Sequence, residues 1–224
     1  MCSWALNEFT MMGSGPRRDA ARTAAQRTID YIIRRQGDNG LFDNGDVYVT
    51  LWQPFAIKSA LVARLNVPGP AVAKMNRALD LTVASGYGTP PRIDDAGRRH
   101  GEPTIRLTAM WLAARFVSGR DRRDPHCVGQ LAWLTRDDAH LKTVRAAKDL
   151  ETVQFIVNAL FRVGGACWRD MWAAARPALA AHQVKHGPLR GSWPAETHAD
   201  RVRATAFACL SLEVYFTGIS APAP

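Results

Sequence analysis

Two groups of residues far apart in the chain combine an amide, a glycine and an aromatic ring in the same order. They are Gln36, Gly40 and Phe42 in the first group and Gln183, Gly191 and Trp193 in the second. An amide beside an aromatic ring could bind a ligand, and a glycine lets backbone approach closely. Buried polar side chains more often satisfy backbone groups, however, so we interpret both groups as structural turns rather than catalytic sites.

The chain is basic but lacks the pattern of a nucleic-acid-binding surface. It has 29 Lys and Arg residues against 20 Asp and Glu residues, a formal net charge of +9. Its arginine clusters, such as 17–18, 34–35 and 98–99, are short, and no aromatic residues alternate with them as they do in single-strand binders. The sequence therefore favours a solvated basic surface over nucleic-acid binding.

Cysteine spacing and hydropathy indicate a chain without disulfides or a membrane span. Cys2, Cys127, Cys167 and Cys209 form no CxxC pair, so we expect reduced, largely buried thiols. No apolar run is long enough to cross a membrane, and the N-terminus lacks the basic and apolar regions of a signal peptide. We expect the chain as written to be cytoplasmic and without a cofactor, and its location is left open for a longer chain with an upstream N-terminus.

Helical periodicity dominates the whole chain and predicts an all-α fold. Amphipathic helices are expected over 20–35, 71–84 and 167–185, with a shorter helix over 125–135, and apolar helices over 47–65, 104–117, 149–163 and 203–216. Asp46 and Asp124 are expected N-caps. Pro54 and Pro177 fall inside predicted helices and should kink or restart them.

These helices form four successive units, each an amphipathic helix followed by an apolar one. The apolar helices share a pattern in which Thr precedes an aromatic residue or Met by two positions, as at Thr50, Thr108 and Thr205. A concentric array explains both helix types, because inner helices touch neighbours on most sides while outer helices present one polar face to solvent.

The Gln-x-x-x-Gly-x-aromatic turn resembles the QW repeat of the prenyltransferase/squalene oxidase repeat superfamily, which includes squalene and hopene cyclases and prenyltransferase β subunits. Similarity continues in order through 46–60, 107–110, 158–165, 191–194 and 212–215, and is nearest to bacterial repeat proteins of unassigned activity. The resemblance implies an α/α toroid-like array of helix hairpins. The turn glutamine would bond backbone at the start of the next helix, with the aromatic ring packed over it.

The chain departs from the family at its beginning. Residues 1–16 look like a partial inner helix of a preceding repeat, residues 17–219 form the repeat domain, and residues 220–224 are expected to be a disordered tail. Phe42 also stands where the family usually has Trp. With only four pairs, the array should be incomplete or open, and an exposed apolar edge at its N-terminal end would bind a protein partner.

The resemblance also suggests chemistry to look for, which the residues do not match. Class II cyclases protonate substrate through D-x-D-D, whereas Asp94-Asp95, Asp137-Asp138 and Asp43/Asp46 do not form that motif. Prenyltransferases hold zinc through Asp, Cys and His. Here His198, Asp200 and Cys209 have poor spacing for a shared metal, so we expect none.

The expected function is therefore non-catalytic: a binding or scaffolding repeat protein that holds a protein or a lipid-like ligand. Aromatic residues on the inner helices are mostly core, and they are also the candidates to line a concave face. They are Trp52, Trp111, Phe155 and Phe207. The alternatives are a cyclase- or prenyltransferase-type enzyme acting on an isoprenoid, and a truncated gene product without independent function.

Overall fold

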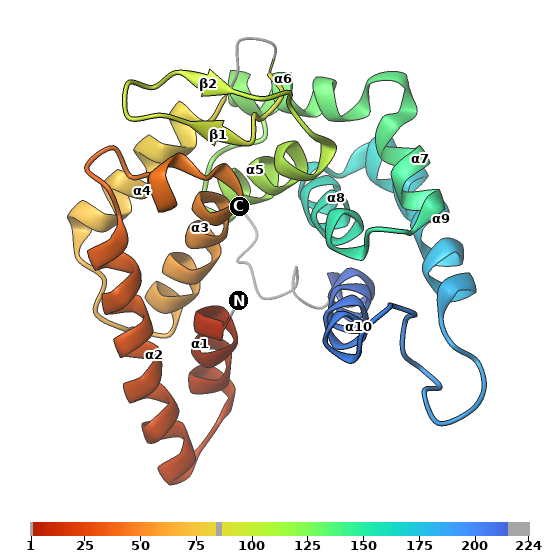
Figure 1. Cartoon of the computed structure of the whole chain (residues 1–224), viewed down its shortest axis with the longest axis horizontal. Helices are drawn as coiled ribbons and strands as arrows, with labels where there is room; N and C mark the ends of the chain where they lie inside the picture. Colours follow the sequence, from red (N-terminus) through yellow and green to blue (C-terminus); the bar gives the residue numbers. More distant parts are fainter. Residues whose placement is uncertain (1, 84–86, 215–224) are drawn as a thin grey trace. The chain divides into compact units, whose positions relative to one another are not determined.

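The structure, a computed structural model, describes residues 2–83 and 87–214 (Figure 1). These residues are predominantly helical, which confirms the all-α prediction. The helices are α1 Cys2–Met12, α2 Gly15–Arg35, α3 Val47–Val62, α4 Gly69–Leu81, α5 Ile105–Val117, α6 Pro125–Thr135, α7 Ala139–Ala146, α8 Leu150–Val163, α9 Gly165–His182 and α10 His198–Leu212. Predicted residues 220–224 lie outside the described part.

Local side-chain chemistry explains where several helices begin. Asp46 Oδ1 accepts from Val49 N and caps α3, and Asp124 Oδ1 accepts from His126 N and caps α6, as predicted. Thr104 and Asp149 cap α5 and α8 in the same way. Each cap satisfies one of the backbone N–H groups that a helix start leaves without an intrahelical partner.

A short helix and a β-hairpin were not predicted. Helix α7 follows a short 3-10 turn, Arg136–Asp138, and has only eight residues, too few for a clear hydrophobic period. Strands β1 Arg92–Ile93 and β2 Arg99–His100 pair antiparallel, with Arg92 opposite His100. Two-residue strands show no alternation, so this hairpin becomes apparent only from its hydrogen bonds.

The two internal prolines do not end their helices. Helix α3 continues through Pro54 and α9 continues through Pro177, so the predicted restart does not occur. Pro54 is buried among apolar neighbours along α3. Packing of this kind offsets the hydrogen bond that a proline removes from the helix.

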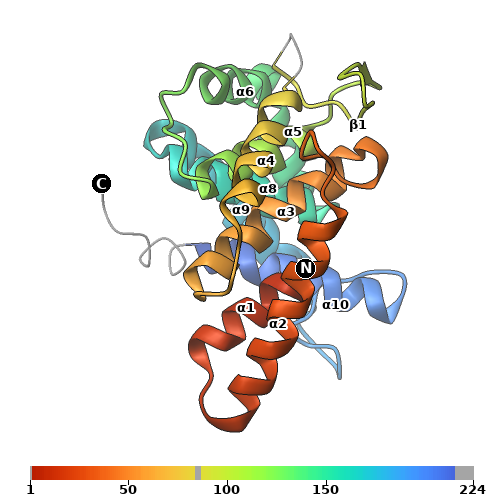
Figure 2. The ribbon, with the colours of Figure 1, turned by 90° about the vertical axis from the view of Figure 1, so that its left-hand side faces the viewer.

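The described residues divide into two compact units, which are treated separately. The first contains residues up to 107 together with 114–121, and the second contains 108–113 and residues from 122 onward. In the first unit α1 packs on α2 and α3, α2 packs on α3, and α3 packs on α4. The turn of the α1–α2 hairpin lies at the opposite end of this unit from α4 (Figures 1 and 2).

In the second unit the apolar and amphipathic helices form separate layers. Helix α8 packs on α10, helix α7 packs on α9, and α8 also contacts α9. Residues 150–157 of α8 are all buried, as expected for a helix with neighbours on most sides. Among the described residues, no helix is long and apolar enough to cross a membrane.

Candidate functional site

The first predicted turn group forms hydrogen bonds within the protein. Gln36 Nε2 donates to the carbonyl oxygen of Ala71 in the first turn of α4, at 3.3 Å. Phe42 donates its backbone N–H to Thr50 Oγ1, at 3.1 Å, and Thr50 in turn donates to the Asp46 carbonyl. Gln36, Phe42 and Thr50 are all buried, so these side chains hold the turn against α3 and α4.

The second turn group repeats part of this arrangement. Trp193 donates its backbone N–H to Thr205 Oγ1 at 3.1 Å, and its indole Nε1 donates to the Leu179 carbonyl in the last turn of α9. Gln183 Nε2 donates to the Gly191 carbonyl within the loop itself. In both groups, therefore, the aromatic backbone N–H bonds a Thr of the following apolar helix.

The two turn glycines differ in their surroundings. Both have positive φ, +87° at Gly40 and +89° at Gly191. A Cβ on Gly40 would lie 2.0 Å from the Lys74 carbonyl oxygen, whereas a Cβ on Gly191 would meet nothing within 4 Å. In the first turn, the neighbouring helix leaves no room for a side chain, so glycine is required there. In the second turn, only the positive φ favours glycine.

Three of the four predicted lining aromatics belong to the core. Trp111, Phe155 and Phe207 are buried. Only Trp52 is half-buried. The apolar residues around these rings remove them from solvent, and the helical period could not distinguish this from a concave surface.

Trp52 belongs to a continuous row of aromatic rings in the first unit. Trp4 of α1 stacks on Phe55 of α3 with centroids 5.7 Å apart, Phe55 contacts Trp52 at 6.0 Å, and Trp52 contacts Tyr48 edge-on at 6.3 Å. Trp4, Trp52 and Tyr48 are half-buried, so part of each of these residues reaches solvent. Trp4 Nε1 donates to Glu8 Oε1 at 2.9 Å, which fixes the first ring.

The sequence predicted Trp52 as a lining residue, but it did not predict Trp4, Phe55 or Tyr48 beside it. The positions 48, 52 and 55 follow helical spacing along α3 and could have been grouped from the sequence. The stacking of Trp4 from another helix could not. A row of partly exposed rings can bind apolar or aromatic groups, and the only proton donors on these four side chains are the indole and phenol groups.

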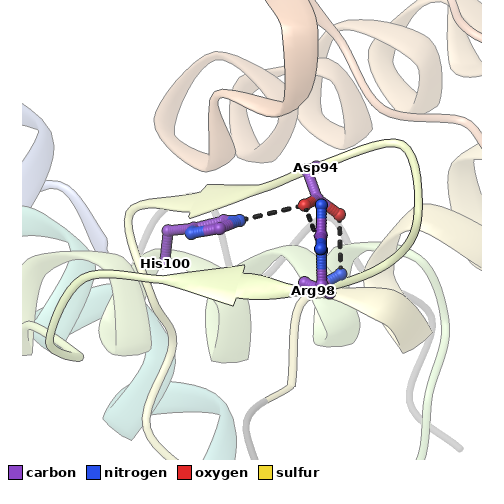
Figure 3. Close-up of polar contacts among 3 residues, drawn as sticks. All are labelled: Asp94, Arg98 and His100. Carbon is purple, nitrogen blue, oxygen red and sulfur yellow. Dashed lines mark hydrogen bonds and ion pairs between the residues drawn. The ribbon is translucent and has the colours of Figure 1, made fainter.

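The Asp94-Asp95 string lies in the β1–β2 hairpin, where Asp94 organises the turn (Figure 3). Its carboxylate accepts from the backbone N–H and the Nε of Arg98 and lies 3.1 Å from His100 Nε2. The backbone hydrogen bond from Arg98 is the largest cause that lowers the pKa of Asp94, followed by the His100 and Arg98 side chains. A lowered pKa is the opposite of what the general acid of a cyclase needs.

Other charged groups of interest are also engaged. Asp46 is the cap of α3, and Arg115, which is buried, forms an ion pair with Asp80 of α4. This ion pair offsets the cost of burying the Arg115 charge.

The residues considered for zinc do not form a site. Asp200 accepts from the Thr197 hydroxyl at the start of α10 and lies near Arg203. Cys209 is exposed, but partial desolvation by its surroundings, with Glu213 nearby, raises the pKa of its thiol, opposite to what a metal thiolate needs. In the described part of the chain, no three His, Cys, Asp or Glu residues group closely enough to hold a metal ion.

The predicted burial of the thiols holds for only part of the set. Cys127 is buried, Cys167 is half-buried and Cys209 is exposed, while the Cys2 side chain lies outside the described part. Exposure of Cys209 contradicts the predicted burial at that position.

Comparisons with protein families, curated proteins and solved structures find no match to this chain.

Proposed function

We propose that this chain is a non-catalytic binding protein, built from helix-pair repeats, that holds an apolar, lipid-like ligand on the aromatic row of Trp4, Phe55, Trp52 and Tyr48. The observation that carries the proposal is the row itself: four rings in sequential contact, three of them half-buried. Aromatic rings provide large, rigid apolar contact area at little cost in side-chain entropy.

The surroundings of the acidic groups support a binding role over catalysis. Asp94 is ionised within its turn, and Asp46 and Asp200 lie at helix starts, where they accept hydrogen bonds. A cyclase requires a carboxylic acid that stays protonated, and a prenyltransferase requires a metal-bound thiolate. Neither requirement has a counterpart among these groups.

We also propose that the chain is related to the QW repeat superfamily. Support comes from the common bond that joins each turn to the following apolar helix, Phe42 N–H to Thr50 and Trp193 N–H to Thr205. Repeat proteins reuse one supersecondary unit with the same internal contacts, so two such bonds in equivalent turns favour a common unit. The proposal includes an array of four helix pairs that is incomplete or open.

Binding of farnesol, an uncharged isoprenoid alcohol, tests the proposed ligand class. Titration followed by the indole N–H signals in two-dimensional NMR should shift the signals of Trp4 and Trp52. The Trp52→Ala variant should weaken binding about tenfold or more, since one ring in a stacked row contributes on the order of 1–3 kcal/mol.

Trp133→Ala is the matched control, because Trp133 is also half-buried but stacks against Arg136 in the second unit. Its affinity for farnesol should equal that of the unmodified chain. Equal weakening by both substitutions, or no titratable shift at Trp4 and Trp52, would contradict the proposed site. Release of a cyclised product from squalene or of a prenylated peptide from farnesyl diphosphate would favour the enzyme alternatives instead.

A further inference from the structure

One end of the first unit gathers large apolar side chains in contact with solvent. Exposed residues at the C-terminal ends of α1 and α3 make up this surface, which is called the tip: Phe9, Met11, Met12, Leu61 and Val62. Met12 is 79% exposed and Val62 is 67% exposed. Single exposed apolar residues are common on soluble proteins, but a cluster of large ones marks an interaction surface.

Hydrogen bonds from one turn of α2 hold the two helix ends together. Arg18 Nε donates to the Thr10 carbonyl at 2.9 Å, and Arg22, one helical turn later, donates to the carbonyls of Ala63 and Arg64 at 2.9 and 2.6 Å. The two arginines thus bind the C-terminal ends of α1 and α3, respectively, to neighbouring positions on α2. The residues of the tip therefore come from two helix ends that share one region of α2, although about 50 positions separate them in sequence.

Helix α1 buries polar residues and exposes apolar ones, the reverse of an ordinary surface helix. It buries its polar residues Ser3, Asn7 and Thr10, and Asn7, fully buried, donates to the Ala56 carbonyl and to Ser59 Oγ at 3.1 and 2.8 Å. The apolar residues at the end of the same helix face solvent. These specific polar contacts, rather than a shortage of buried space, direct the apolar side chains outward.

The surroundings of the tip are positively charged. Segments 9–22 and 61–66 contain Arg17, Arg18, Arg22 and Arg64 against a single acidic residue, Asp19, which gives a net charge of 4 − 1 = +3. Arg17, Arg18 and Arg64 are exposed, whereas Arg22 is half-buried. Apolar side chains surrounded by arginines complement a surface that is apolar inside and anionic outside.

From these observations we propose that the tip binds an anionic membrane surface, with Met12 and Val62 entering the interfacial layer and Arg17 and Arg64 contacting lipid phosphates. In both views the α1–α2 turn projects beyond the rest of the first unit and the end of α3 is set back from it, so the end of α1 would enter a lipid interface first (Figures 1 and 2). Two copies joined tip to tip would place the same arginines against each other, which opposes self-association. This inference concerns a different surface from the aromatic row.

Flotation with vesicles tests the inference directly. The full chain should float with phosphatidylcholine vesicles that contain about one-third phosphatidylserine, and should remain at the bottom with phosphatidylcholine alone. Binding should weaken as salt is raised, because the arginine contribution is screened. The Arg17→Gln/Arg64→Gln variant should bind roughly 20-fold more weakly, since each basic residue near the surface contributes about a fivefold factor.

The Met12→Ser/Val62→Ser variant should lower the membrane partition coefficient by at least about tenfold, since it removes exposed apolar surface. Val202→Ser is its matched control, because Val202 is 59% exposed but lies on α10 in the second unit. Circular dichroism should be the same for all variants, since the substituted residues are exposed. The proposal is wrong if neutral and anionic vesicles bind equally, if the tip variants float like the unmodified chain, or if the chain binds no vesicle.

Discussion

Gly45 lies at a point where neighbouring backbone leaves no room for a side chain. Its φ is +85°, and a Cβ built there would lie 1.6 Å from the carbonyl oxygen of Ile93 in β1. The Val47 N–H donates to the Pro91 carbonyl beside it, so the start of α3 and the β1–β2 hairpin are joined through backbone. The first unit therefore depends on this glycine for both its conformation and its size.

Gly45→Ala should consequently destabilise the protein by about 3 kcal/mol or more, because steric overlap with backbone adds to the strain of positive φ. Gly119→Ala is the control for strain alone, since Gly119 has a φ of +88° and open space around it. Its loss should be about 1 kcal/mol. Urea unfolding measures both free energies, and equal losses would show that the close approach to Ile93 has no consequence.

At the scale of elements, a hydroxyl group joins each predicted turn to the next apolar helix. Thr50 accepts from Phe42 N–H in a buried setting, and Thr205 accepts from Trp193 N–H where the threonine is half-buried. The two bonds have the same length, 3.1 Å, but differ in access to water. Their energetic importance should differ accordingly.

Replacing each threonine by valine, which has nearly the same shape, tests this difference. Thr50→Val should lower the free energy of unfolding by about 1–3 kcal/mol, because the buried Phe42 N–H loses its acceptor. Thr205→Val should lower it by less than about 1 kcal/mol, because water can replace the hydroxyl. Denaturant unfolding of both variants provides the comparison, and a larger loss for Thr205→Val would contradict it.

At the scale of the whole molecule, His140 links global stability to pH. It is buried on α7, and its Nδ1 has no hydrogen-bond partner among the described residues. Desolvation is the largest cause that lowers the pKa of His140, while Asp138 nearby raises it. The folded chain thus favours neutral imidazole more strongly than the unfolded chain does.

The sign of the pH effect follows from this difference. Because the folded pKa lies below the ordinary value of 6.5, the unfolded chain binds the proton first, and stability is lost as pH falls below about 6.5. His140→Leu should reduce the loss of unfolding free energy between pH 7.5 and pH 5.5, whereas His186→Gln, at an exposed residue, should leave it unchanged. Guanidinium titrations at the two pH values measure this, and an unaltered pH dependence in His140→Leu would refute the assignment.

The features that could be predicted from sequence depend on residues close together in the chain. Apolar residues at steps of three and four predicted the helices, and the Asp46 and Asp124 caps bond N–H groups two or three residues away. The α7 helix and the β1–β2 hairpin were missed because eight and two residues carry too little periodic signal. The predicted restart of the helices at Pro54 and Pro177 was wrong, because both helices continue through these prolines.

The sequence by itself determined an all-α chain in which amphipathic and apolar helices alternate, because helix formation and capping are decided by near neighbours. Only the tertiary structure decided which aromatic rings reach solvent, since burial depends on residues distant in the chain. Trp52 and Phe207 each follow a threonine by two positions, yet Phe207 is buried and Trp52 is half-buried. The apolar tip arises in the same way, from contacts between Arg18, Arg22 and carbonyl groups up to 42 positions away.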